Sequence, residues 1–246
     1  MNPDQDAEPS AIYLSEYVFD INEGSGFLAA LPPGDQRQVR AMGTRCPFEK
    51  GTAVFHQGDA HTGIWIIEKG RARTYYTAPS GREITLAYWS AGHFIGGPEV
   101  FGTGRHVWSS DALEPCEMLF LSGASLRKLV RTQPEVAIAV IEGLVAKGKC
   151  YSALIQMLGT RSVAERLRQF LVILADANGH QEGNSVIIAR TITYEQIATV
   201  VGATRQWVTQ SLDKLRADGV LDLTRGEIVI HDVTALHLYG SAARNA

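Results

Sequence analysis

The chain is poor in cysteine, and its three cysteines lie far apart. Cys46, Cys116 and Cys150 show no paired spacing, so the pattern supports neither a disulfide framework nor a four-thiolate metal or iron–sulfur site. No apolar run reaches the length that spans a membrane, and the first ten residues are acidic and polar rather than a signal peptide. We therefore expect a cytoplasmic protein that makes no contact with a membrane.

The chain also lacks an excess of basic residues. Its 23 Lys and Arg against 26 Asp and Glu give a formal net charge of −3, and the region from residue 161 to the end holds nine basic and nine acidic residues.

No His-x-His segment occurs, although a metal-dependent enzyme built on a β-roll would need such a pair followed by Glu. We therefore expect no catalysis, no metal site and no cofactor.

What the chain does contain is a continuous pattern over residues 190–232 that predicts a winged helix-turn-helix. A short apolar strand at residues 186–192 comes first, and Thr193 with Gln196 three residues later fits a capping box. The helix that starts there would bury Ile197, Ala198, Val200 and Val201. Gly202 is placed to end it in a left-handed turn.

A second helix, capped by Thr204 and running to about Asp218, carries residue types that read DNA bases. Its inner stripe is Val208, Leu212 and Leu215, which leaves Arg205, Gln206, Thr209 and Gln210 on the outer face. Arg can chelate guanine, Gln can pair with adenine, and Thr offers a methyl to thymine. Gly219 would close this helix, and residues 221–230 predict a hairpin wing. Together the candidate DNA-binding residues are Arg205, Gln206, Thr209, Gln210, Thr204, Thr193, Lys214 and Arg225. The alternative is a small α+β packing module with a solvated polar helix face.

The amino-terminal half has the pattern of a double-sheet jelly roll. Short β-prone runs alternate with glycine turns at residues 52–56, 63–67, 70–76, 83–89, 94–95, 107–111 and 117–121. Such a roll has an interior that can hold a small ligand. Before it, residues 26–42 predict a short helix pair that packs through Leu28, Leu31, Val39 and Met42.

A long helix at residues 134–158 is expected between the two halves. Its apolar seam has spacings of four and three residues, which is the a/d pattern of a coiled coil: Ala137, Ile141, Leu144, Gly148, Tyr151, Ile155 and Leu158. This seam predicts a partner helix; the alternative is that it packs on the chain's own roll. Residues 159–162 then predict a hinge, and Ser162 can cap the next helix, at residues 163–175.

In this order the segments resemble the Crp/Fnr family of bacterial transcription regulators. The resemblance is carried by residues 48–51, 57–59, 63–70, 92–96, 162–167 and 193–202, together with Arg205. It implies an α+β protein with an extension at residues 1–25, a cyclic-nucleotide-binding-like jelly roll at 26–133, a dimerisation helix at 134–158, a hinge at 159–162 and a winged helix domain at 163–246. It also implies a homodimer on a symmetric double-stranded DNA site, and RNA polymerase as a further partner.

The effector cannot be carried over from the family. In members that bind cyclic AMP, a Glu holds the ribose and an Arg-Ser or Arg-Thr pair holds the cyclic phosphate. When this chain is matched to them without gaps from Phe94, Gly97 stands at the position of the Glu and Val107-Trp108 at the positions of the pair. A buried phosphate without Arg would be an unpaired charge, so we expect no cyclic AMP, although a local shift could bring in Arg105. Residues 1–44 hold no cysteine for an iron–sulfur sensor. As haem ligands we considered His56, His61, His93 and His106, and we interpret them as surface or hydrogen-bonded residues.

What remains is a pocket with aromatic and apolar walls. Trp108 and Tyr151 suit a small organic or aromatic effector. The candidate pocket residues are Gly96, Gly97, Glu99, Arg105, Val107, Trp108, Ser109, Tyr151 and Ser152. The alternative is that Val107, Trp108 and Tyr151 fill the cavity, which would leave a regulator controlled by its abundance.

Overall fold

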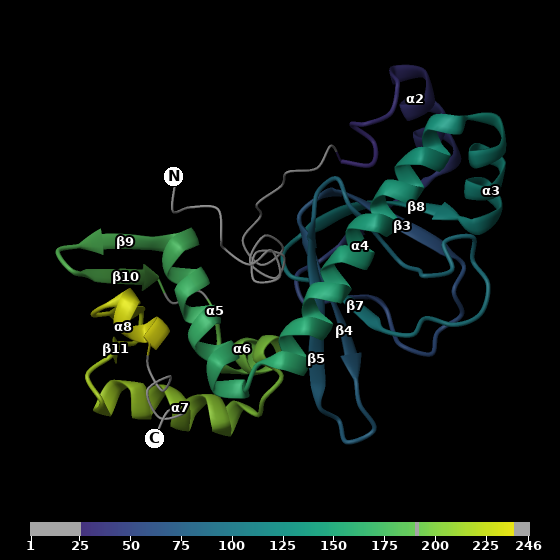
Figure 1. Ribbon diagram of the computed structural model, residues 1–246. Coiled ribbons are helices and arrows are strands. Elements are labelled where there is room, and N and C mark those ends of the chain that lie inside the picture. Colours follow the sequence, from purple (N-terminus) through teal and green to yellow (C-terminus); the bar gives the residue numbers. More distant parts are fainter. Residues whose placement is uncertain (1–25, 190–191, 239–246) are drawn as a thin grey trace. The chain divides into compact units, whose positions relative to one another are not determined.

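The chain divides into two compact units, one ending at Leu154 and the other beginning at Ile155. The computed structural model describes residues 26–189 and 192–238; Figure 1 shows their helices and strands. The expected extension at residues 1–25 and the strand residues Arg190 and Thr191 lie outside the described residues. Each unit is described separately below.

The first unit is built on two four-stranded antiparallel sheets. One has the strand order β1-β8-β3-β6 and the other β2-β7-β4-β5. The strands are β1 (Thr44–Phe48), β2 (Ala53–Phe55), β3 (Gly63–Lys69), β4 (Arg71–Thr77), β5 (Glu83–Ser90), β6 (Phe94–Ile95), β7 (Ser109–Ala112) and β8 (Cys116–Ser122). The jelly-roll expectation is therefore confirmed.

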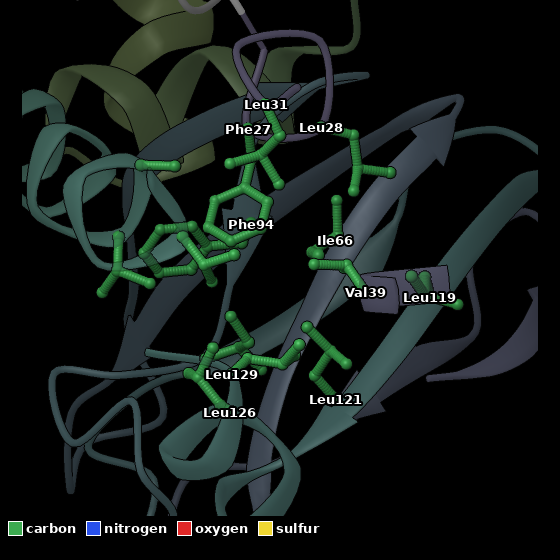
Figure 2. Packing of buried hydrophobic residues seen from close by; sticks show 14 of the residues in the cluster. Phe27, Leu28, Leu31, Val39, Ile66, Phe94, Leu119, Leu121, Leu126 and Leu129 are labelled. Atoms are coloured by element: carbon green, nitrogen blue, oxygen red, sulfur yellow. The ribbon is translucent and has the colours of Figure 1, made fainter. Parts of the chain in front are cut away.

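Both faces of the β1-β8-β3-β6 sheet are covered, and this is why β3 is apolar from Gly63 to Ile67. Ile64 and Ile66 belong to a cluster that includes residues of α2 (Pro33–Met42), α3 (Gly123–Thr132) and α4 (Pro134–Thr160). Ile67 belongs instead to a second cluster, made of residues from both sheets. Figure 2 shows part of the first cluster, with Leu126 and Leu129 of α3 among its members.

Three parts of this unit differ from the sequence-based expectation. Strand β1 and helix α3 were not expected. The expected helix pair at residues 26–42 is wrong in its first half, because residues 27–30 form a turn in which Ala30 N–H donates to Gly26 O at 2.9 Å. The expected packing residues nevertheless pack: Leu28, Leu31 and Val39 are buried, and Met42 lies against the same cluster.

Helix α4 presents two faces with the same four-and-three spacing. The buried residues are Val136, Ala139, Val140, Lys147, Cys150, Ala153 and Leu154. The predicted seam lies one residue further along, and Ile141 and Ile155 on it are 59% and 70% exposed. The alternative that the whole seam packs on the chain's own roll is thus wrong, although Leu144 lies partly against the core.

The second unit is a helix bundle on a four-stranded sheet with the order β11-β12-β10-β9. Its elements are α5 (Val163–Asn178), β9 (Gly179–Glu182), β10 (Ser185–Ala189), α6 (Tyr194–Val201), α7 (Arg205–Ala217), β11 (Leu221–Leu223), β12 (Glu227–Ile230) and α8 (Val233–Leu238). Strand β10 covers the described part of the expected strand up to Ala189, and Ile192 does not belong to a strand. Strand β9 and helix α8 were not expected.

The break between α4 and α5 is shorter than the expected hinge at residues 159–162. Gly159 and Thr160 still belong to α4, so only Arg161 and Ser162 separate the two helices. Ser162 caps α5 as expected, because its side chain accepts from the Glu165 N–H and the Glu165 carboxylate accepts from the Ser162 N–H. This capping box fixes where α5 begins.

Candidate DNA-binding surface and sensor site

Helix α6 begins and ends at the predicted residues. Thr193 Oγ1 accepts from the Gln196 N–H at 3.2 Å, and Gln196 Oε1 accepts from the Thr193 N–H at 2.9 Å. Gly202 ends the helix with φ 66° and ψ 46°, a conformation that costs little only in glycine. The predicted buried stripe is confirmed, since Ile197, Ala198, Val200 and Val201 are each at most 1% exposed.

Helix α7 is anchored by its predicted inner stripe. Val208 and Leu212 are fully buried and Leu215 is 4% exposed. Thr204 caps the helix, because its Oγ1 accepts from the Trp207 N–H at 3.2 Å. The side chains of Thr193 and Thr204 are therefore structural caps, and any contact they make with DNA would be additional to that role.

The opposite face of α7 holds the predicted base-reading residues. Arg205, Gln206 and Gln210 are exposed, and Thr209 is half-buried. The Thr209 hydroxyl donates to Arg205 O at 3.0 Å, so the methyl is the part of this side chain that is left for a base. Arg205 forms no ion pair with another described residue. The geometry leaves its guanidinium available to a ligand.

The wing follows α7 as a tight hairpin. Leu221–Leu223 pairs with Glu227–Ile230, and the turn is held by Thr224, whose Oγ1 accepts from the Glu227 N–H at 3.0 Å. Lys214 on α7 and Arg225 in the turn are exposed, and neither has an ion-pair partner in the described part of the chain. These two side chains can therefore supply positive charge to phosphates.

Arg166 on α5 was not expected as a site residue, yet its guanidinium donates to three backbone carbonyl oxygens. It is 8% exposed. Its Nε donates to Val201 O at 2.8 Å, and its Nη1 donates to Arg161 O at 2.9 Å and to Leu158 O at 3.4 Å. One guanidinium thus joins the end of α4, the break and the end of α6. Charged and polar residues surround Arg166 in the sequence, namely Glu165, Arg168 and Gln169, so no local pattern predicts its burial.

In the first unit, the structure separates the candidate pocket residues, most of which belong to the segment at residues 94–110, called the cassette below. Gly96, Gly97 and Ser109 are buried, whereas Glu99, Arg105 and Ser152 are exposed. Arg105 Nη1 donates to Gly58 O at 2.6 Å on an exposed turn. The structure therefore does not show the local shift that would place Arg105 in a buried phosphate site.

The two aromatic candidate pocket residues, Trp108 and Tyr151, lie close together. The rings of Trp108 and Tyr151 lie 5.5 Å apart at 59°, and both pack against the cluster between the sheets. Val107 is 49% exposed, so the interpretation that Val107 helps to fill the cavity is wrong. Ser109 Oγ accepts from the Gln57 N–H at 2.9 Å, which makes it a structural contact of the loop.

Two of the four histidines are buried, and the interpretation of the histidines as surface or hydrogen-bonded residues is wrong for one of these two, His106. His61 and His106 are 3% and 2% exposed, with ring centroids 4.3 Å apart. His61 Nε2 accepts from the Gly97 N–H, while both ring nitrogens of His106 lack a partner among the described residues. Burial lowers the pKa of His61, and burial followed by the neighbouring His61 lowers the pKa of His106 to about 4. Both rings are therefore neutral at pH 7.

Lys147 is a buried cation that the sequence analysis missed. It is 6% exposed, its Nζ donates to Phe94 O at 2.5 Å, and the rings of Trp89 and Phe94 lie 3.9 and 4.3 Å from that nitrogen. Burial lowers the pKa of Lys147 to about 7. Its position on the second apolar stripe of α4 is the feature of the sequence that could have predicted its burial.

The described part of the chain offers no metal site and no membrane span. Within residues 26–189 and 192–238, no group of three or more His, Cys, Asp or Glu side chains is placed to hold a metal ion. None of the described helices combines the length and the apolar character that crossing a membrane requires.

Two protein families match the chain, in the order that the fold shows. The cyclic nucleotide-binding domain matches residues 45–133, and the Crp-like helix-turn-helix domain matches residues 165–239. A β-roll of the cyclic nucleotide-binding type joined to a helix-turn-helix defines a class of DNA-binding regulators. The chain belongs to the Crp/Fnr family of transcription regulators, so the expectation of a regulator rather than an enzyme is confirmed.

Curated relatives and a solved structure agree with this assignment. The chain is 24% identical to the global nitrogen regulator of Synechocystis sp. over 77% of this chain and 85% of the relative. It is 25% identical to a CRP-like cAMP-activated global transcriptional regulator of Mycobacterium tuberculosis, over 75% and 83%. The structure of the c-di-GMP responsive global regulator CLP of Xanthomonas campestris has a TM-score of 0.72 at 22% identity, over 81% and 99%; this likeness shows the fold. Relatives with such different names leave the effector open.

Proposed function

We propose that two copies of this chain bind an inverted DNA repeat, with α7 of each copy in a major groove. The observation that carries the proposal is the division of α7 into two faces. Val208, Leu212 and Leu215 hold the helix from one side, and Arg205 with its neighbours is exposed on the other. A helix held in this way presents its polar side chains in a fixed order to the base edges.

The side chains on this face favour particular bases. Arg205 can donate two hydrogen bonds to guanine, whereas Gln206 and Gln210 favour adenine. We therefore expect each half of the repeat to keep one guanine and to be rich in A·T pairs beside it. Because the region from residue 161 onward has no net positive charge, binding to unrelated DNA should be weak and sensitive to salt.

The second copy is proposed on the exposed seam of α4. Ile141 and Ile155 are 59% and 70% exposed, and Ile138 and Val145 beside the seam are 47% and 51% exposed. A group of exposed apolar side chains on one helix supports an interface with a partner. A Cβ added to Gly148 would meet nothing within 4 Å, so the seam has room for the close approach of another helix at this point. Two-fold pairing of α4 would give the protein the symmetry of an inverted repeat.

We also propose that the regulator responds to a small organic molecule other than cyclic AMP. The buried part of the cassette holds Gly97 and His106 but no arginine, and a cyclic phosphate there would be an unpaired charge. Contact with RNA polymerase stays a prediction from the family resemblance.

Selection of binding sites from random DNA tests the proposal. The wild type should enrich an inverted repeat. Arg205→Ala should weaken binding by about 1–3 kcal/mol and relax the preference at one symmetric pair of positions. Lys214→Ala is the matched variant, because loss of a phosphate contact should weaken all sequences about equally. An unchanged preference in Arg205→Ala would remove this residue from the base readers, and no enriched sequence with the wild type would overturn the proposal.

A further inference from the structure

The first unit contains a cavity that none of the candidate pocket residues lines. Its volume is about 300 Å³, and it lies between the turn at residues 26–30, the turn before β6 and helix α4. Phe27 and Phe94 form apolar walls with their rings edge to face at 5.8 Å; Figure 2 shows both. Ala139, Gly143 and Ala146 of α4 form the small-residue side of the lining, and Gly143 has no side chain where the Phe94 ring lies against α4. A volume of this size is at the lower end of the range for small-molecule sites.

The wall of this cavity contains a cation that lacks an anion. Lys147 lines it, and among the described residues its only hydrogen bond goes to Phe94 O. An ammonium group has three N–H donors, so two of them are without a hydrogen-bond acceptor in the part of the chain that the structure describes. The faces of Trp89 and Phe94 compensate in part through cation–π contacts.

The other titratable residues near Lys147 do not supply this anion. Glu142 and His93 line the same cavity, but neither forms a hydrogen bond or ion pair with Lys147. Glu142 is exposed, so water screens its charge. Cys150, one turn further along α4, acts on Lys147 only at a distance.

We propose that this cavity binds a small organic carboxylate whose charged group pairs with Lys147 and whose apolar body lies against Phe27 and Phe94. Such a ligand would complete the hydrogen bonding of a buried ammonium group and would fill an apolar space. The inference deepens the proposed function, because it names the site and the chemical class of the effector. Binding itself can be measured without DNA, so the two proposals can fail separately.

Proton uptake is the signature of this pairing. Burial lowers the pKa of Lys147 to about 7, so at pH 8 about nine-tenths of the free protein carries a neutral amine there. A carboxylate favours the charged form and raises the pKa. Binding should therefore take up about 0.9 proton at pH 8 but only about 0.1 proton at pH 6.

Titration calorimetry with benzoate, cyclohexanecarboxylate and hexanoate tests the proposal. The neutral amide benzamide is the matched ligand, and two buffers of different ionisation enthalpy measure the proton uptake. At least one carboxylate should bind saturably to the full-length wild type with the stated uptake, and benzamide should bind at least about tenfold more weakly, the factor that 1.4 kcal/mol corresponds to.

Three variants locate the site. Lys147→Met keeps a side chain of similar length without charge and should lose binding, and Ala146→Leu should lose it by filling the cavity. Lys149→Met removes an exposed lysine of the same helix and should bind as the wild type does. The proposal is overturned if no carboxylate binds at millimolar concentration, if benzamide binds equally well, if Lys147→Met binds unchanged, or if the uptake is the same at pH 6 and pH 8.

Discussion

Replacing Arg166 by Met should destabilise the second unit strongly. The substitution removes two hydrogen bonds shorter than 3 Å, from Nε to Val201 O and from Nη1 to Arg161 O, and a longer one to Leu158 O. A hydrogen bond from a charged group contributes about 1.5–3 kcal/mol. Removing the buried charge offsets part of this loss, so we expect the free energy of unfolding to fall by about 3 kcal/mol.

Thermal unfolding followed by circular dichroism measures this loss. A change of 1 kcal/mol shifts Tm by roughly 4–8 °C in a domain of this size, so the expected shift is about 12 °C or more. Hydrogen exchange should localise the effect to the amides of α6. Arg168→Met is the matched control, because Arg168 lies on the same helix without a described hydrogen bond or ion pair. Equal melting temperatures of the two variants would refute this account of Arg166.

Three further predictions concern the first unit and α4. Ile141→Glu combined with Ile155→Glu should give monomers in sedimentation velocity, because the change places charges on the exposed part of the seam; a double variant that still forms dimers would argue against this interface. Cyclic AMP should give no saturable heat in titration calorimetry at micromolar concentration, because Gly97 stands where a carboxylate would hold the ribose; saturable binding would show this alignment to be wrong. The neutral forms of His61 and His106 are favoured in the folded state because burial lowers their pKa values. Their contribution to stability is therefore present above pH 6.5 and is lost as the pH falls toward about 4. His106→Leu should reduce the fall in the free energy of unfolding over this range, and an identical pH dependence in both proteins would contradict the assignment.

The sequence predicted the second unit well because its signals are local. A capping residue, a left-handed glycine and an apolar stripe lie within a few positions of each other, as at Thr193 and Gly202. Strand β9 was missed because Gly179–Glu182 is polar and exposed at every position, so nothing in its composition favours a strand. Its pairing with β10 supplies what propensity does not.

Helix α4 shows why the sensor site was harder to predict. Two stripes with the same spacing run along it, one residue apart, and periodicity does not say which one the roll buries. The roll buries the stripe that contains Lys147 and Cys150, whereas Ile141 and Ile155 of the more regular apolar seam stay exposed. The choice depends on contacts with Trp89 and Phe94, which lie more than fifty residues away in sequence.

A titration of the selected inverted repeat against a scrambled duplex, with the mass of the complex measured by sedimentation, tests the central claim most directly. The account predicts two chains per duplex and a preference for the repeat of about 10³-fold or more at physiological salt. It also predicts that Arg205→Ala reduces this preference while the complex keeps two chains. Equal affinity of the wild type for both duplexes, or one chain on the repeat, would contradict the claim that paired α7 helices read a symmetric DNA site.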